Sequence, residues 1–187
     1  MAAGIEHGRR SRPNIRIIAW AGAAALLLVP LVAMQVTQEV AWDVTDFAFF
    51  GGLLLSVGGA YELLVRASGN ATYRAAAAIA LAGVFLLVWV NAAVGIIGSE
   101  ADNANLLFAG VIATGVAGAC LARLQPRGMA RALVATALAQ ALVGMVALMG
   151  RLGVMSSAWP GDIFAATGFF AGLWLLSAWL FGRAARA

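Results

Sequence analysis

The chain has 187 residues; 63% of them are hydrophobic, 11% are charged, and the mean hydropathy is +0.93. This composition excludes a soluble globular domain, in which about a quarter of the residues are charged. The formal net charge is +4, and all of the positive side-chain charge comes from arginine, because the chain has no lysine. The arginines cluster beside apolar segments, which indicates membrane topology rather than nucleic-acid binding.

Six apolar segments follow one another along the chain, each close to the roughly 20 residues that cross a bilayer as an α-helix. We therefore predict an all-α, polytopic membrane protein with six transmembrane helices, short connections and no soluble domain. Residues 1–16 are predicted to form a basic N-terminal tail, residues 17–182 the helical bundle, and residues 183–187 a C-terminal tail. The predicted spans are residues 17–36, 47–65, 75–97, 106–122, 132–150 and 163–182.

The connections between the spans alternate in the sign of their charge. Eleven of the twelve arginines precede the first span, follow the last, or lie in the connections at 66–74 and 123–131. Arginine near a span end is retained on the cytoplasmic side, so both termini are predicted to lie in the cytoplasm. Arg151 is the exception. The first span is long for the core of a signal peptide and is predicted to be a retained anchor.

The spacing of polar residues indicates three tandem helical hairpins. Three arginines open the odd-numbered spans 58 and 57 residues apart, and three acid or amide residues open the even-numbered spans 59 and 57 residues apart. Such repeats can surround a pseudo-threefold axis along the membrane normal. Any six-span protein with short loops gives a similar period, so duplication and coincidence both stay open. The six landmarks are Arg16, Arg74, Arg131, Asp46, Asn105 and Asp162.

Three polar side chains lie within or beside the predicted spans. Asn91 and Gln140 fall well inside the bilayer, where an amide must face the bundle interior or a wet cavity. They either line a solute path or form hydrogen bonds between helices. Glu62 lies nearer the inner face, one turn before Arg66. An i,i+4 ion pair is the simpler interpretation, and a proton-relay role is the alternative.

The carboxylates of the other connections are predicted to face the periplasm. Clustered there, they would gather cations, and the loop 98–103 holds enough oxygen donors for a divalent ion, although its spacing is not that of an EF-hand. The alternative is helix capping, which we expect for Asp46, Asn105 and Asp162. The residues of the candidate periplasmic cation site are Asp43, Asp46, Glu100, Asp102 and Asp162.

Glycine is frequent, with 22 residues, and in membrane helices it allows close approach of two backbones. Helix packing, within the chain or to a partner subunit, is therefore predicted at four positions. These are Gly51, Gly58, Gly168 and Gly172.

The residues that the chain lacks restrict its chemistry. His7, in the N-terminal tail, is the only histidine, and Cys120 is the only cysteine. No cofactor is predicted, since histidine-ligated haem, a His/Cys metal site, a lysine Schiff base and a hydrolytic triad all lack their residues. Cys120 lies within a span and is expected to be a buried, inert thiol.

Two stretches resemble a known group of proteins. These are Trp89-Val-Asn91-Ala-Ala-Val-Gly-Ile-Ile-Gly98-Ser-Glu-Ala-Asp-Asn-Ala-Asn105 and Arg123-Leu-Gln-Pro126-Arg-Gly128-Met-Ala-Arg131-Ala-Leu. They are similar to an uncharacterised family of small, multi-span bacterial inner-membrane proteins, most clearly over residues 74–150. The resemblance implies a bacterial inner membrane and carries over no activity and no site.

Three functional hypotheses follow. The first is a non-catalytic inner-membrane protein that packs in a larger membrane assembly or as a homo-oligomer. The second is a small transporter or channel for a cation or small neutral solute, with an acidic periplasmic mouth and with Asn91 and Gln140 lining the path. The third is a membrane enzyme acting on lipid or quinone, with Glu62 as proton donor. The expected partners are the lipid bilayer and other membrane subunits, and not nucleic acid.

Overall fold

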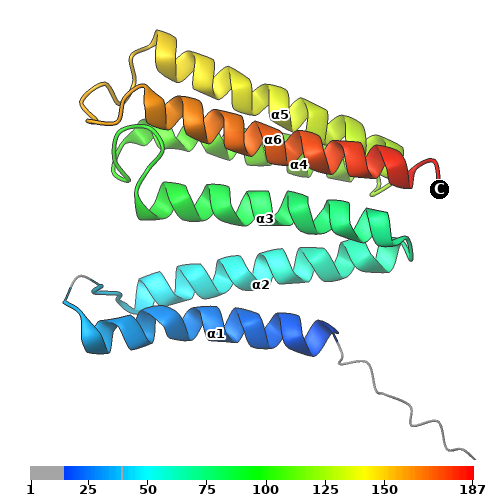
Figure 1. Cartoon of the computed structure of the whole chain (residues 1–187), viewed down its shortest axis with the longest axis horizontal. Coiled ribbons are helices and arrows are strands. Elements are labelled where there is room, and N and C mark those ends of the chain that lie inside the picture. The colour runs from blue at the N-terminus through cyan, green and yellow to red at the C-terminus, as the bar shows by residue number, and fades with distance from the viewer. Residues whose placement is uncertain (1–14, 39) are drawn as a thin grey trace, which may run out of the picture. The chain divides into compact units, whose positions relative to one another are not determined.

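The computed structural model describes residues 15–38 and 40–187, and all regular structure in these residues is helical (Figure 1). Residues 1–14 of the predicted basic tail, with His7, Arg9, Arg10 and Arg12, lie outside the described residues, as does Glu39. The helices are α1 (Ile15–Val36), α2 (Val44–Ala67), α3 (Ala71–Ala93), the short 3₁₀ helix η1 (Asn103–Leu106), α4 (Leu107–Leu121), α5 (Pro126–Met149) and α6 (Gly161–Ala184).

Five helical segments are long and apolar enough to cross a membrane: α2, α3, η1 with α4, α5 and α6. The described side chains of α1 add a shorter apolar stretch, Trp20–Val36. The predicted all-helical, multi-pass membrane character is thereby confirmed. Helix α5 begins six residues before the predicted span because Pro126 occupies its first turn, where the missing N–H leaves no hydrogen bond unmade.

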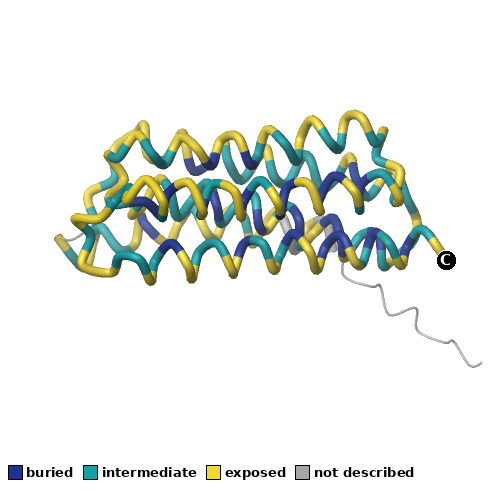
Figure 2. The backbone as a smooth tube through the Cα atoms, turned by 90° about the horizontal axis from the view of Figure 1, so that it is seen from above, coloured by how far each residue is buried: buried dark blue, intermediate teal, exposed yellow. Residues whose placement is uncertain are grey.

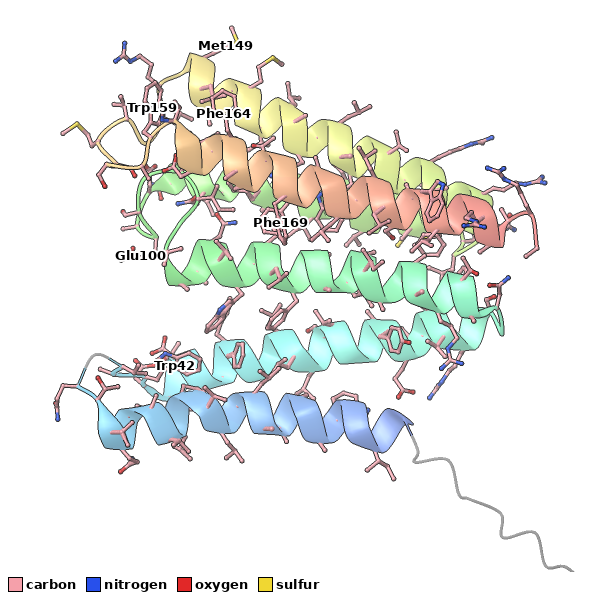
Figure 3. The ribbon with its side chains drawn as sticks, viewed as in Figure 1. Trp42, Glu100, Met149, Trp159, Phe164 and Phe169 are labelled. Atoms are coloured by element: carbon pink, nitrogen blue, oxygen red, sulfur yellow. The ribbon has the colours of Figure 1, made fainter. Side chains whose placement is uncertain are left out.

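Backbone contacts divide the chain into two compact units, residues 1–54 and residues 55–187. In the first unit, the side chain of Leu27 on α1 lies 3.8 Å from the point where a Cβ on Gly51 would stand. Trp42, labelled in Figure 3, packs edge-on against Phe47 and Phe50, with ring centroids 5.2 and 5.5 Å apart. These contacts join α1, the connection and the start of α2.

In the second unit, α5 packs against both α4 and α6, and α3 packs against α6. Buried residues line the inner faces of these helices, while their outer faces stay exposed (Figure 2). The consecutive helices α3 and α4 make far fewer close backbone contacts than the packed pairs do. The connection between them therefore joins two helices that do not form a closely packed pair.

Small residues bring these helices together. A Cβ on Gly83 of α3 would stand 2.7 Å from the Trp174 ring of α6, and a Cβ on Gly118 of α4 would stand 2.6 Å from Ala132 of α5. A Cβ on Gly144 of α5 would collide with Thr167 of α6. Lipid is as apolar as the helix surfaces, so dispersion contacts at such close approaches, rather than exclusion of water, hold the bundle together.

Buried hydrogen bonds fix how α3 sits on its neighbours. The Tyr73 hydroxyl donates to the carbonyl of Leu124 at 2.7 Å, and its ring packs edge-on against Phe181. The Ser177 hydroxyl donates to the carbonyl of Ala76 at 2.7 Å. These contacts place the start of α3, the α4–α5 connection and the last turns of α6 at one end of the unit.

Charge separates along the second unit. The end just described, here called the arginine end, holds seven arginines, which lie at the helix ends and connections that meet there: Arg66, Arg74, Arg123, Arg127, Arg131, Arg183 and Arg186. The opposite end, here called the carboxylate end, holds Glu100, Asp102 and Asp162 together with Arg151. Helices of 23 or 24 residues separate the two ends by about 35 Å, which is enough to cross the hydrocarbon core of a bilayer, about 30 Å thick.

Candidate functional site

A pocket of about 300 Å³ opens at the carboxylate end, between α3 and the η1–α4 segment. The pocket lies where α3 and α4 are not closely packed against each other. Its polar lining comes from the predicted candidate Asn91 and from the connection between the two helices, and its apolar lining comes from the helices themselves. The lining includes Leu87, Asn91, Glu100, Asp102, Phe108 and Ile112.

Asn105 holds the connection in shape. Its Oδ1 accepts from the backbone N–H groups of Ile96 and Ile97, at 3.0 and 2.9 Å. Its Nδ2 donates to the carbonyls of Ile97 and Ser99, at 3.1 and 2.7 Å. The expectation that Asn105 caps a helix is therefore wrong, because its side chain is fully used in binding the loop. Asp102 takes the capping position instead and accepts from the Ala104 N–H at 2.9 Å.

Two glycines let this connection meet the α5–α6 connection. Gly98 and Gly153 have φ of +73° and +70°, values that side-chain-bearing residues rarely adopt. A Cβ on Gly98 would stand 2.8 Å from Asp102 Oδ2 and 3.4 Å from the Gly153 Cα. The two connections therefore cross in contact, which fixes the acidic segment at the mouth of the pocket. Sequence reasoning missed this crossing, although the isolated glycines of both loops signalled unusual backbone.

Asn91 uses only part of its hydrogen-bonding capacity. Its Nδ2 donates to the carbonyl of Leu87 at 2.7 Å, one turn earlier on α3. Its Oδ1 is buried and has no hydrogen-bond partner among the described residues. A buried carbonyl without a donor costs about 1–3 kcal/mol, so Asn91 is the least satisfied group in the pocket wall.

Gln140 lies elsewhere. It is 0% exposed on α5, and neither its Nε2 nor its Oε1 has a hydrogen-bond partner in the described chain. The approach of Gly115 to Thr136, 3.3 Å from a Cβ position to Oγ1, sets the register of α4 on α5 and places Gln140 level with Val111. Gln140 does not line the α3–α4 pocket, so the two intramembrane amides do not share that cavity.

The other predicted candidates are occupied by local interactions. Glu62 lies 3.7 Å from Arg66, in the i,i+4 arrangement expected from the sequence. Asp43 and Asp46 form a reciprocal capping box at the start of α2: each carboxylate accepts from the other residue's backbone N–H at 2.9 Å. Asp162, in the first turn of α6, accepts from the Ser156 hydroxyl and from the Ile163 N–H.

No group of three His, Cys, Asp or Glu side chains gathers into a metal-binding arrangement among the described residues. Arg151 stands at the carboxylate end, where its guanidinium lies 5.9 Å from the centre of the Trp159 ring. A cation over an indole face is stabilised electrostatically, so this arginine, which departs from the charge pattern, has a favourable local contact. The thiol of Cys120, expected to be buried, is exposed on α4.

The outer face of α6 is the second feature with functional potential. Gly168 and Gly172 are exposed, and no atom lies within 4 Å of the Cβ position of either. Beside them an apolar groove of about 360 Å³ runs between α5 and α6, lined in part by Met149 and Phe164 (Figure 3). Of the other predicted packing glycines, Gly51 approaches Leu27 as described, and Gly58 is half-buried.

Comparisons with protein-family models, with curated proteins and with solved structures find no match to this chain. The resemblance over residues 74–150 thus gains no residue role from a relative. What the described residues define is a class: an all-helical chain with five helical segments long and apolar enough to cross a membrane, and with an acid-lined pocket between α3 and α4.

Proposed function

We propose that the chain is a non-catalytic, multi-pass protein of a bacterial inner membrane, with both termini in the cytoplasm, and that it works as a homo-oligomer assembled through α6. The single observation that carries this proposal is the open space over Gly168 and Gly172. The arginine end then faces the cytoplasm and the carboxylate end the periplasm, in keeping with the retention of arginine.

The glycines inside the bundle show what such positions do. Gly83, Gly118 and Gly144 each receive a side chain or helix of the same chain at close range. Gly168 and Gly172, four residues apart on one face, form the same small-xxx-small pattern and receive nothing from the chain. A second copy of α6 would bring its own glycines to this face, and two backbones would approach closely. Exposed Phe164 and Leu175 flank the pair and would add dispersion contacts.

Native mass measurement of the full chain in mild detergent tests this proposal. We expect an oligomer in the parent and a shift toward monomer in the double variant Gly168→Leu, Gly172→Leu. Gly110→Leu is the matched control, since Gly110 is an exposed helical glycine of α4 with nothing within 4 Å of its Cβ position. The proposal is contradicted if the parent chain is monomeric, or if the double variant forms the same oligomer as the parent.

A second candidate is the transport of a cation or small neutral solute, which the α3–α4 pocket favours because it joins Asn91 to the acidic connection. Flux into liposomes tests it: Asn91→Leu should lower the flux, and Gln140→Leu, outside this pocket, should lower it less. Absence of flux in the parent chain removes this candidate. Glu62 is paired with Arg66, so we do not propose it as a proton donor.

A further inference from the structure

We propose that the α3–α4 pocket binds a small organic cation, an ammonium group carried on an apolar body. This inference names the ligand class of the second candidate function and holds whether or not the ligand crosses the membrane. It does not depend on assembly through α6. Three independent features of the pocket carry it: its charge, an unsatisfied acceptor and its apolar floor.

The charge of the lining selects a cation. Glu100 is exposed and Asp102 half-buried, both line the pocket, and no basic residue stands among its described lining. The basic side chain of this end, Arg151, is held over the Trp159 ring. Two carboxylates at the edge of a low-dielectric bundle raise the local concentration of cations and disfavour anions.

The unsatisfied acceptor selects a ligand that donates hydrogen bonds. Asn91 Oδ1 lies in the pocket wall without a donor, while its Nδ2 is committed to the Leu87 carbonyl. Oδ1 has almost no exposed surface, so a bound ammonium N–H reaches it only when the amide turns about its terminal torsion, which is broad in asparagine, and gives up the Nδ2 hydrogen bond to Leu87. The bond then recovers the cost of the buried carbonyl, and a charged donor strengthens it.

The floor of the pocket selects an apolar body over a bare metal ion. Three apolar side chains of the helices line the pocket: Leu87 and Phe108, which are buried, and Ile112, which is half-buried. A volume of about 300 Å³ lies at the lower end of the range for small-molecule sites. No group of three His, Cys, Asp or Glu side chains among the described residues is placed to hold a metal ion, which favours an organic cation over a bare metal ion.

Binding of benzylammonium to the purified full chain tests the proposal, with benzyl alcohol and benzoate as neutral and anionic probes of similar shape. We expect saturable binding of benzylammonium by calorimetry, at least about tenfold tighter than benzyl alcohol, and no binding of benzoate. Equal binding of the alcohol and the ammonium overturns the proposal, and so does a parent chain that binds none of the three.

Variants locate the site. Glu100→Gln with Asp102→Asn removes both charges and keeps a capping oxygen on η1, so benzylammonium binding should weaken about tenfold. Asp162→Asn, a charge removal at the same end but outside the pocket, should leave binding unchanged. Ile112→Trp fills the pocket without changing charge and should abolish binding. Binding that is equal in all three variants overturns the proposal.

Native mass of the same samples reports assembly separately, so failure of the α6 proposal and failure of this one are distinguishable.

Discussion

The Cα of Gly153 lies 3.4 Å from the point where a Cβ on Gly98 would stand, so two connections 55 residues apart in the sequence cross in contact. Both glycines have positive φ. The crossing ties the α3–α4 connection to the α5–α6 connection and so determines where the acidic segment lies relative to the pocket.

Replacing either glycine should therefore destabilise the carboxylate end. For Gly98→Ala and Gly153→Ala we expect a loss of about 1–3 kcal/mol in the free energy of unfolding, because each adds backbone strain and a steric clash. Reversible unfolding in detergent measures it. Gly161→Ala, at the same end with nothing within 4 Å of its Cβ position, is the control and should change little. Equal effects at all three positions would refute the crossing.

Replacing glycine by alanine should have opposite effects on stability at Gly144 and at Gly168. Gly144→Ala places a methyl group against Thr167 on α6 and should cost about 1–3 kcal/mol through overpacking of α5 on α6. Gly168→Ala adds the same group into open space, and because alanine is the better helix former it should raise the unfolding free energy of the monomer by about 0.5–1 kcal/mol. Unfolding of both variants at a detergent-to-protein ratio that favours monomer provides the comparison. A larger loss at Gly168 would contradict the structure.

Gln140 is expected to destabilise the bundle. Its amide is buried with no partner among the described residues, so Gln140→Met keeps the length of the side chain and removes the desolvated polar atoms. The free energy of unfolding should rise by about 1 kcal/mol. Ser177→Ala is the control in the opposite direction, because it removes the buried hydrogen bond to Ala76 and should lower stability. A loss of stability in Gln140→Met would show that the amide has a polar partner after all.

Asn105 should be essential for the shape of the α3–α4 connection. Asn105→Leu removes four hydrogen bonds to residues 96–99 and leaves several backbone groups without partners. We expect a loss of about 2–4 kcal/mol and faster proteolysis within residues 94–106. Asn103→Leu, at an exposed position of the same segment, serves as control and should change neither. Unaltered protease sensitivity in Asn105→Leu would show that these hydrogen bonds do not hold the connection in shape.

The helices could be predicted from the sequence because length and apolarity alone decide which segments can cross a bilayer. The Glu62–Arg66 pair followed from helical spacing, which is a local property. The role of Asn105 could not be predicted in this way. Its position before an apolar run is typical of a cap, but its partners depend on the path of a loop that turns back at Gly95 and Gly98.

The pocket could not be predicted from the sequence either. Asn91, Glu100 and Asp102 were each singled out as candidates, but which of them meet depends on α3 packing on α6 rather than on α4. Hydrophobic periodicity is weak in helices that are apolar on every face, so it does not identify the neighbour of each face. The same limit applies to Gln140, for which a partner across the interface was one of two expectations and none is present in the described chain.

The separation of charge along the second unit leads to a direct test of orientation. If the arginine end faces the cytoplasm, a cysteine at the carboxylate end is reachable from outside the cell and one at the arginine end is not. In a Cys120→Ala background, Glu100→Cys should react with a membrane-impermeant maleimide in intact spheroplasts. Arg127→Cys should react only after the membrane is permeabilised. Both positions lie in or beside connections, so neither substitution disturbs helix packing, and labelling of Arg127→Cys in intact spheroplasts would reverse the proposed orientation.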